Sequence, residues 1–275
     1  MNSLFFLTDL RVIYIVIIRL FCVGLVISSL EYLFTLRNYS SSGIFSWKVL
    51  RLKPGVLNSK FYNDSFDIFF EKAGFGTLVV FRLLSGLSLL VYPITSFSIF
   101  FLVIIVFTSL LISFRNIVGD DGSDQMNLLI CLTLLITFLG KDTGVARLGL
   151  YFICLQAILS YTIAGIAKLI SRKWNRGLAI YEITNTHTYG NEMIAGWLKR
   201  LPPVYTKILN WNIIVFECLY FLVIFLPYPF FLIFLFWGFL FHLYNAVSMG
   251  LNGFFWAFLA CYPSIIYVNA HFHLS

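Results

Sequence analysis

The stretch LYFICLQAILSYTIAGIAKLI, residues 150–170, decides the fold of this protein. A helix of about 20 apolar residues spans the hydrocarbon core of a bilayer, and this stretch is long enough to do so. Its only charged residue is Lys168. A charge in such a segment is costly unless it reaches water or a partner inside the protein. The stretch therefore predicts a membrane helix and makes Lys168 the first residue to explain.

Similar apolar stretches recur along the whole chain. Its 275 residues are 60% hydrophobic and 11% charged, a composition that suits a protein whose outer surface is covered by lipid. We expect an all-α, polytopic integral membrane helix bundle with about seven or eight transmembrane helices. We also expect a single domain over residues 1–275, located in the cell membrane as a multi-pass protein. The expected helices cover residues 11–35, 75–93, 97–114, 126–139, 147–170, 210–227, 229–248 and 251–268.

Two polar segments, residues 37–74 and 171–209, interrupt this pattern. Each is too short for an independent domain, and we expect both to form capping loops over the bundle. Thirteen Lys and Arg residues lie on the side of these segments and three on the opposite side, if every expected helix spans. The positive-inside rule then predicts that both segments lie in the cytoplasm. The net charge of +7 sits between apolar runs, which favours the lipid bilayer as partner over nucleic acid.

No metal site and no nucleotide site is predicted. The five cysteines lie in apolar runs without a C-x-x-C pair, and they are typical of small buried side chains. The chain has no Walker A loop, no G-x-G-x-x-G, no H-E-x-x-H and no G-x-S-x-G. These absences argue against nucleotide chemistry and against the familiar kinds of hydrolysis.

The helix around Lys168 allows two interpretations. Tyr161 and Ala164 precede Lys168 by seven and four residues and share its helical face. Ala164 and Gly165 leave room for a close helix neighbour or for a flat ligand. A buried lysine that gives up its proton is a usable general base. The alternative is a lysine that snorkels from the last helical turn to the membrane surface.

Other polar groups also allow both a functional and a structural interpretation. The stretch GDDGSDQMN, residues 119–127, places Asp120, Asp121 and Asp124 in a glycine-rich turn. These carboxylates are candidates for binding a cation or orienting a base. The structural alternative is that Ser123 or Asp124 caps a helix that begins near Gln125. Glu217 and His242 lie inside apolar runs, where polar groups usually face the bundle interior and pair with each other.

The sequence YTIAGIAKLISRKWNRGLAI, residues 161–180, resembles the signature Y-x-x-A-G-x-x-K-L…W…G-x-A of the horizontally transferred transmembrane (HTTM) domain. That domain is the membrane core of vitamin K-dependent γ-glutamyl carboxylases and of many bacterial relatives. Other stretches are similar to the family in the same order, and the resemblance covers most of the chain. They are LFCVGLVISSLEYL after Arg19, SSSGIFSWKVL, GSDQ, WNIIVFE and FHLYNAVSMGLNGFFWAFLA.

The resemblance implies that Lys168 is a catalytic base that deprotonates a reduced quinone. It implies a substrate pocket among the candidates Tyr161, Gly165, Trp174, Asp124, Gln125, Glu217 and His242. The chain departs from the carboxylases at one functional position. They carry a histidine in the middle helix region, where this chain has Gln125 or a neighbour, and no histidine precedes His187. The resemblance therefore implies quinone or lipid chemistry more than glutamate carboxylation.

Two functions remain open at this point. The first is base chemistry by Lys168 on a membrane-borne quinol, lipid or peptide, which would make the protein an enzyme. The second is a non-enzymatic accessory role in the maturation or export of a secreted peptide toxin, together with a neighbouring gene product. Short bacterial HTTM proteins of that kind are similar in length to this chain. A plain transporter is disfavoured, because no inverted repeat is visible.

Overall fold

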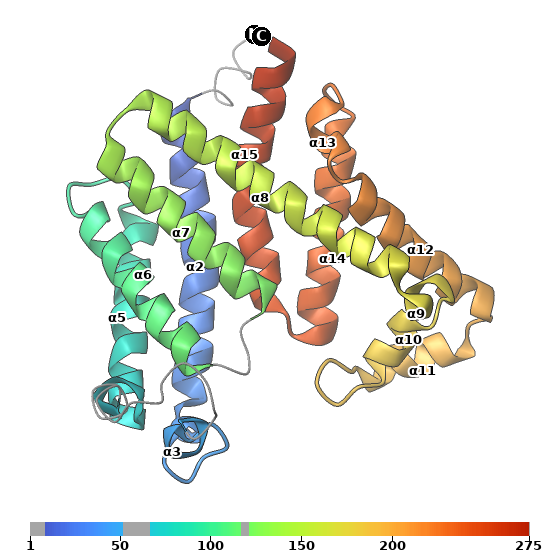
Figure 1. The fold of residues 1–275 in the computed structure, drawn as a ribbon, viewed down its shortest axis with the longest axis horizontal. Helices are drawn as coiled ribbons and strands as arrows, with labels where there is room; N and C mark the ends of the chain where they lie inside the picture. Colours follow the sequence, from blue (N-terminus) through green and yellow to red (C-terminus); the bar gives the residue numbers. More distant parts are fainter. Residues whose placement is uncertain (1–8, 52–66, 117–120, 275) are drawn as a thin grey trace. The chain divides into compact units, whose positions relative to one another are not determined.

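The computed structural model describes residues 9–51, 67–116 and 121–274. The protein is all-α as predicted, and the described residues contain no β-strand. Figure 1 shows long helices joined by short connections and two groups of shorter helices. The elements are α2 (Leu10–Phe34), η1 (Leu36–Tyr39), α3 (Trp47–Leu50), α5 (Lys72–Val91), α6 (Ser98–Arg115), α7 (Gly122–Gly140), α8 (Thr143–Ile170), α9 (Arg172–Asn175), α10 (Ala179–Thr184), α11 (Glu192–Arg200), α12 (Pro203–Leu219), α13 (Leu222–Phe225), α14 (Phe231–Met249) and α15 (Asn252–Leu274).

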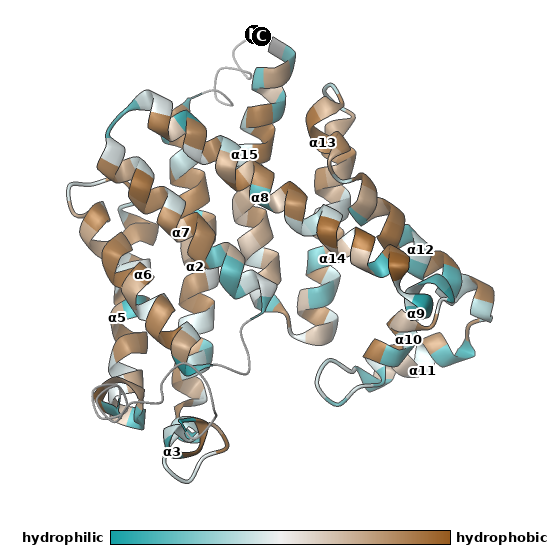
Figure 2. Cartoon of the chain, in the orientation of Figure 1, coloured by the Kyte–Doolittle hydropathy of each residue, from teal (hydrophilic) through white to brown (hydrophobic). Residues whose placement is uncertain are grey.

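Seven of these helices are long and apolar enough to cross a membrane, namely α2, α5, α6, α7, α8, α14 and α15. Large apolar side chains on them are exposed, such as Phe81, Phe107 and Ile136. Exposed apolar surface on this scale suits contact with lipid and not with water. Hydrophobic residues run along the long helices, and hydrophilic residues are frequent on α9 and α11 (Figure 2). The protein is thus a multi-pass helical bundle of the membrane type.

The expected helix over residues 210–227 is divided in the structure. α12 ends at Leu219, a turn follows, and α13 covers only Leu222–Phe225. Asn269 of α15 explains how the chain can end α13 at Phe225. Its Nδ2 donates to the carbonyl oxygens of Val223, Ile224 and Leu226 at 2.9, 3.1 and 2.8 Å. Carbonyl groups that lose their helical partners are thereby satisfied inside the protein.

The short expected helix at residues 126–139 is longer in the structure. α7 has 19 residues because it begins at Gly122, ahead of the predicted start near Gln125. The predicted cap was wrong, since Asp121 is the N-cap residue. Its carboxylate accepts from the backbone N–H groups of Ser123 and Asp124, and Asp124 bonds back to the Asp121 N–H in a capping box. Asp120 lies outside the described residues, as do Lys53 and Lys60 of the charge count.

The chain forms two compact units. Tyr14–Ala146 makes up the N-terminal unit, and Arg147–Ser275 with Met1–Ile13 makes up the C-terminal unit, in each case as far as the residues are described. In the N-terminal unit α6 packs against both α5 and α7. In the C-terminal unit α14 and α15 pack together, and the polar segment 171–209 folds into α9, α10, α11 and the start of α12. The single domain expected from the sequence stays a prediction.

A buried arginine fixes the first polar segment of the N-terminal unit. Arg115, at the end of α6, is fully buried. Its Nε donates to the Phe70 carbonyl oxygen at 3.0 Å and its Nη2 to the Phe45 carbonyl oxygen at 2.8 Å. Its guanidinium carbon lies 4.5 Å from the ring centroid of Tyr39 and 4.6 Å from that of Phe75. One side chain therefore joins η1, the loop before α3 and the start of α5.

Candidate functional site

Lys168 forms an ion pair with Glu217 inside the C-terminal unit. Its Nζ lies 2.6 Å from Glu217 Oε2, and the two residues are 49 positions apart in the chain. The side chain of Glu217 is 3% exposed and that of Lys168 is 19% exposed. The carboxylate is thus removed from solvent while the ammonium keeps partial access to the surroundings. A pair of this kind is costly to dehydrate, and its members depend on each other.

A glycine lets the two helices of the pair approach each other. A Cβ atom on Gly165 of α8 would lie 2.6 Å from the backbone nitrogen of Cys218 and 2.8 Å from the carbonyl carbon of Glu217, both on α12. Contacts that short do not occur between real atoms, so only glycine fits. Small residues have this role at many helix interfaces in membranes. Gly165 therefore sets the distance across which Lys168 reaches Glu217.

Trp174 lies beside the ammonium of Lys168. The α9 turn follows directly after α8, and Lys168 Nζ is 5.3 Å from the centroid of the Trp174 ring. Asn175 holds this turn, because its Nδ2 donates to the Leu169 carbonyl oxygen at 2.7 Å. The aromatic face stabilises a cation and offers a flat apolar wall. Lys168 thus lies next to two protein groups, Glu217 and Trp174. A lysine that only snorkels to the membrane surface needs no such neighbours.

A second pair, Tyr161 and His242, lies in the same unit. The Tyr161 hydroxyl and His242 Nε2 are 2.7 Å apart, and both side chains are buried. The Tyr161 ring stacks on Tyr220 with centroids 3.8 Å apart, and the His242 ring stacks on Phe258 at 4.4 Å. Nδ1 of His242 has no hydrogen-bond partner among the described residues.

The structure brings five of the candidate residues together in the C-terminal unit besides Lys168. They are Tyr161, Gly165, Trp174, Glu217 and His242. The sequence analysis missed Tyr220, whose ring packs against Tyr161. A signal for it was present in the sequence. Tyr161, Gly165 and Lys168 follow helical spacing on α8, and Phe216 and Glu217 of α12 follow it with Tyr220, the C-cap residue of that helix.

Asp124 and Gln125 belong to the N-terminal unit. Asp124 completes the capping box of α7, and the Gln125 side chain is exposed. Both line a small cavity of about 60 Å³ that also contains Arg82. Arg82 is only 5% exposed. Arg82 was not among the candidates predicted from the sequence.

Comparisons with known proteins do not assign the chain to a family. No protein-family model matches the chain, and neither a curated protein nor a solved structure matches it. The described residues contain no group of three or more His, Cys, Asp or Glu side chains that could hold a metal ion. The membership in the HTTM family stays a prediction from the sequence motifs.

Proposed function

We propose that this multi-pass membrane protein performs base chemistry on a membrane-borne substrate, with Lys168 as the proton acceptor and Glu217 as its partner. The observation that carries the proposal is the 2.6 Å contact between Lys168 Nζ and the buried carboxylate of Glu217. Lys168 lies in α8, which is long and apolar enough to cross a membrane, and an ionisable residue in such a segment is by default a functional-site hypothesis. The resemblance of residues 161–180 to the HTTM signature supports the same role for Lys168.

The pair supplies a base in two proton transfers. The first moves a proton from the Lys168 ammonium to the Glu217 carboxylate and leaves a neutral amine beside a carboxylic acid. The second transfer moves a proton from the substrate to the Lys168 amine and leaves the substrate anion next to an ammonium. Lys168 would therefore both accept the proton and stabilise the charge that forms.

The surroundings of the pair suit a flat and lipid-soluble substrate. Trp174 offers an aromatic face next to Lys168. A groove of about 490 Å³ lies between α12 and α14 of the same unit and is lined by Trp211, Phe216 and Trp237, among others. Phe216 also packs edge-on against Tyr161, with centroids 5.6 Å apart. A reduced quinone fits these features, because it combines a flat ring, an apolar tail and a weakly acidic hydroxyl group that a base can deprotonate.

The experiment uses the full chain in liposomes, with a reduced naphthoquinone that carries an isoprenoid tail as the probe. Oxygen-dependent loss of the hydroquinone is followed for the native protein and for Lys168→Met. The base role predicts a loss of at least about 100-fold in rate, the usual contribution of a general base. Lys199→Met, on the exposed side of α11, is the matched control. Equal rates for the native protein and Lys168→Met would contradict the proposal.

The accessory role in toxin maturation makes the opposite prediction. It expects no turnover of the hydroquinone and full function of Lys168→Met in cells. It also expects co-purification of the native protein with the product of a neighbouring gene. A pull-down from the native membrane, followed by identification of the bound chains, separates the two functions.

A further inference from the structure

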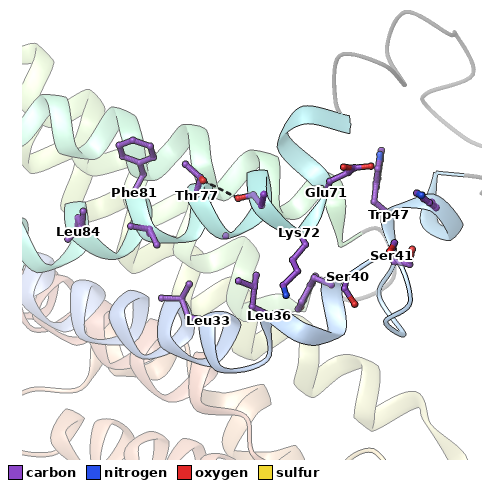
Figure 3. Close-up of a pocket in the computed structure, with 16 residues that line it drawn as sticks. Leu33, Leu36, Ser40, Ser41, Trp47, Glu71, Lys72, Thr77, Phe81 and Leu84 are labelled. Atoms are coloured by element: carbon purple, nitrogen blue, oxygen red, sulfur yellow. Dashed lines mark hydrogen bonds between the residues drawn. The ribbon is translucent and has the colours of Figure 1, made fainter.

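A groove in the N-terminal unit has one charged end and one apolar end. It lies between α2, η1, α3 and the first half of α5 and has a volume of about 890 Å³. Figure 3 shows Lys72 and Ser40 at one end and Phe81 and Leu84 at the other. Concave sites for small molecules have volumes in this range. The groove therefore has the size of a ligand site, and its charged and apolar ends match the two ends of an amphipathic ligand.

The charged end carries one net positive charge. Lys48 and Lys72 contribute two ammonium groups, and Glu71 contributes one carboxylate. All three are exposed, and none of them forms an ion pair within the described part of the chain. A phosphodiester headgroup carries one negative charge. The charges of the groove and of such a headgroup are thus complementary, and basic pockets at helix ends commonly bind anionic headgroups.

A buried hydroxyl at this end has no partner. Ser46 is among the residues that line the groove, and it is only 2% exposed. Its Oγ finds no hydrogen-bond partner among the described residues. Buried hydroxyl groups are nearly always hydrogen-bonded, because an unsatisfied one loses its hydration without compensation. Rotation of the Ser46 side chain toward the groove would let this hydroxyl donate to a phosphate or ester oxygen bound there.

The other end of the groove continues along the outer face of α5. Leu36 forms part of the wall near the charged end, and Val80 and Leu84 follow one turn apart on α5. The side chains of Val80 and Leu84 are 40% and 55% exposed. Both lie within a helix that is long and apolar enough to cross a membrane. An acyl chain could therefore leave the groove along α5 and join the bilayer without crossing polar surface.

The charged end is held in a fixed frame. Trp47 Nε1 donates to Asp67 Oδ1 at 2.5 Å, and Arg51 Nη1 lies 2.8 Å from Asp67 Oδ2. The ring of Trp47 packs edge-on against Phe70, with centroids 4.6 Å apart. Arg115 binds the carbonyl oxygen of Phe70 and so connects α3 to the end of α6. The backbone of the site is thus preformed, so binding a ligand costs little entropy for ordering these segments.

We propose that this groove binds an anionic phospholipid with a single phosphodiester charge, of the phosphatidylglycerol class. The phosphate lies between Lys48, Lys72 and Ser46, and one acyl chain follows Leu36, Val80 and Leu84. A free phosphate would use only the charged end and would leave the apolar wall empty. A zwitterionic lipid would fill the wall, but its cationic group would meet the ammonium groups of the two lysines.

The test measures lipid binding to the full-length protein by native mass spectrometry after removal of endogenous lipid. Phosphatidylglycerol and phosphatidylcholine with identical acyl chains are the two probes. We expect phosphatidylglycerol to bind more tightly by about tenfold, which corresponds to the attraction of a few basic groups near the headgroup. Glycerol 3-phosphate at millimolar concentration should not displace it, because the acyl chain contributes to binding.

Three variants separate the parts of the site. Lys48→Gln with Lys72→Gln should remove the preference for phosphatidylglycerol, whereas Lys199→Gln with Arg200→Gln, which removes the same charge from α11, should keep it. Val80→Trp should weaken both lipids, since it fills the exposed part of the groove without entering the core. Ser46→Ala should weaken phosphatidylglycerol several-fold without lowering the melting temperature of the lipid-free protein. Equal binding of the two lipids to the native protein, or unchanged binding by Val80→Trp, would overturn the proposal.

Discussion

Lys168 and Glu217, which lie 49 residues apart in the chain, meet at 2.6 Å across the interface of α8 and α12. The two side chains differ in exposure, since Lys168 keeps some access to the surroundings and Glu217 keeps almost none. Removing Lys168 and removing Glu217 should therefore lower the stability of the protein by different amounts. This asymmetry makes the energetics of the pair testable without knowledge of the substrate.

Lys168→Met should destabilise the protein more than Glu217→Gln. The first change leaves a buried carboxylate without its counter-charge, at a cost of about 3 kcal/mol. The second leaves a lysine that can turn toward solvent, at a cost of about 1 kcal/mol. Combining the two changes should recover most of the stability, because no buried charge remains. Thermal unfolding in one detergent measures all four proteins, and strictly additive losses would show that the two side chains are not coupled.

Gly165→Ala should weaken the interface between α8 and α12. The added Cβ would lie 2.6 Å from the backbone nitrogen of Cys218, so the helices must move apart, at a cost of about 1–3 kcal/mol. Gly196→Ala in α11 is the matched control, since its Cβ would meet nothing within 4 Å. The control should be neutral or slightly stabilising because alanine favours a helix. A melting temperature for Gly165→Ala equal to that of the control would refute the close contact.

Arg115→Lys should loosen the first polar segment although the charge is kept. Lysine cannot bond to the carbonyl oxygens of Phe70 and Phe45 in the geometry of the guanidinium group, and it loses the planar contact with Tyr39. We expect a loss of about 2 kcal/mol, since a buried guanidinium makes two charged hydrogen bonds here. Limited proteolysis should cut residues 37–51 faster in this variant than in Arg176→Lys, an exposed control. Equal cleavage rates would exclude the fixing role of Arg115.

Asp121→Ala should shorten α7 at its start. The Asp121 carboxylate accepts two backbone hydrogen bonds there, and losing an N-cap costs about 1 kcal/mol. Asp124→Asn should cost less, because an amide oxygen can still accept the bond from the Asp121 N–H. Circular dichroism and thermal unfolding measure both changes. If Asp124→Asn abolished hydroquinone loss while keeping stability, Asp124 would belong to the reacting site and not only to the cap.

The sequence was sufficient for the long helices because each consists of many apolar residues in one run. Seven of the eight expected segments coincide with a long helix within a few residues. The division of residues 210–227 was not predictable in the same way. The short α13 that follows the break is held by Asn269, whose amide reaches carbonyl groups more than forty positions earlier in the chain. A contact of that separation leaves no local pattern.

The candidate site was predictable as a set of residues but not as an arrangement. Lys168, Glu217 and His242 stood out because each is a polar group in an apolar run. Their pairing required knowledge of which helices are neighbours. Asp124 and Gln125 stood out for other reasons, the glycine-rich turn and the family resemblance, and they belong to a different unit. A polar residue in a membrane segment shows that a partner is needed, but helix packing decides which partner it finds.

The central claim is that Lys168 accepts a proton from a membrane-borne substrate. The most direct measurement compares hydroquinone loss by the native protein with that by the double variant Lys168→Met with Glu217→Gln, in liposomes and at equal thermal stability. The account predicts that the double variant folds as well as Glu217→Gln alone and that its rate falls to the background of protein-free liposomes. A double variant that consumes the hydroquinone at the native rate would contradict the claim.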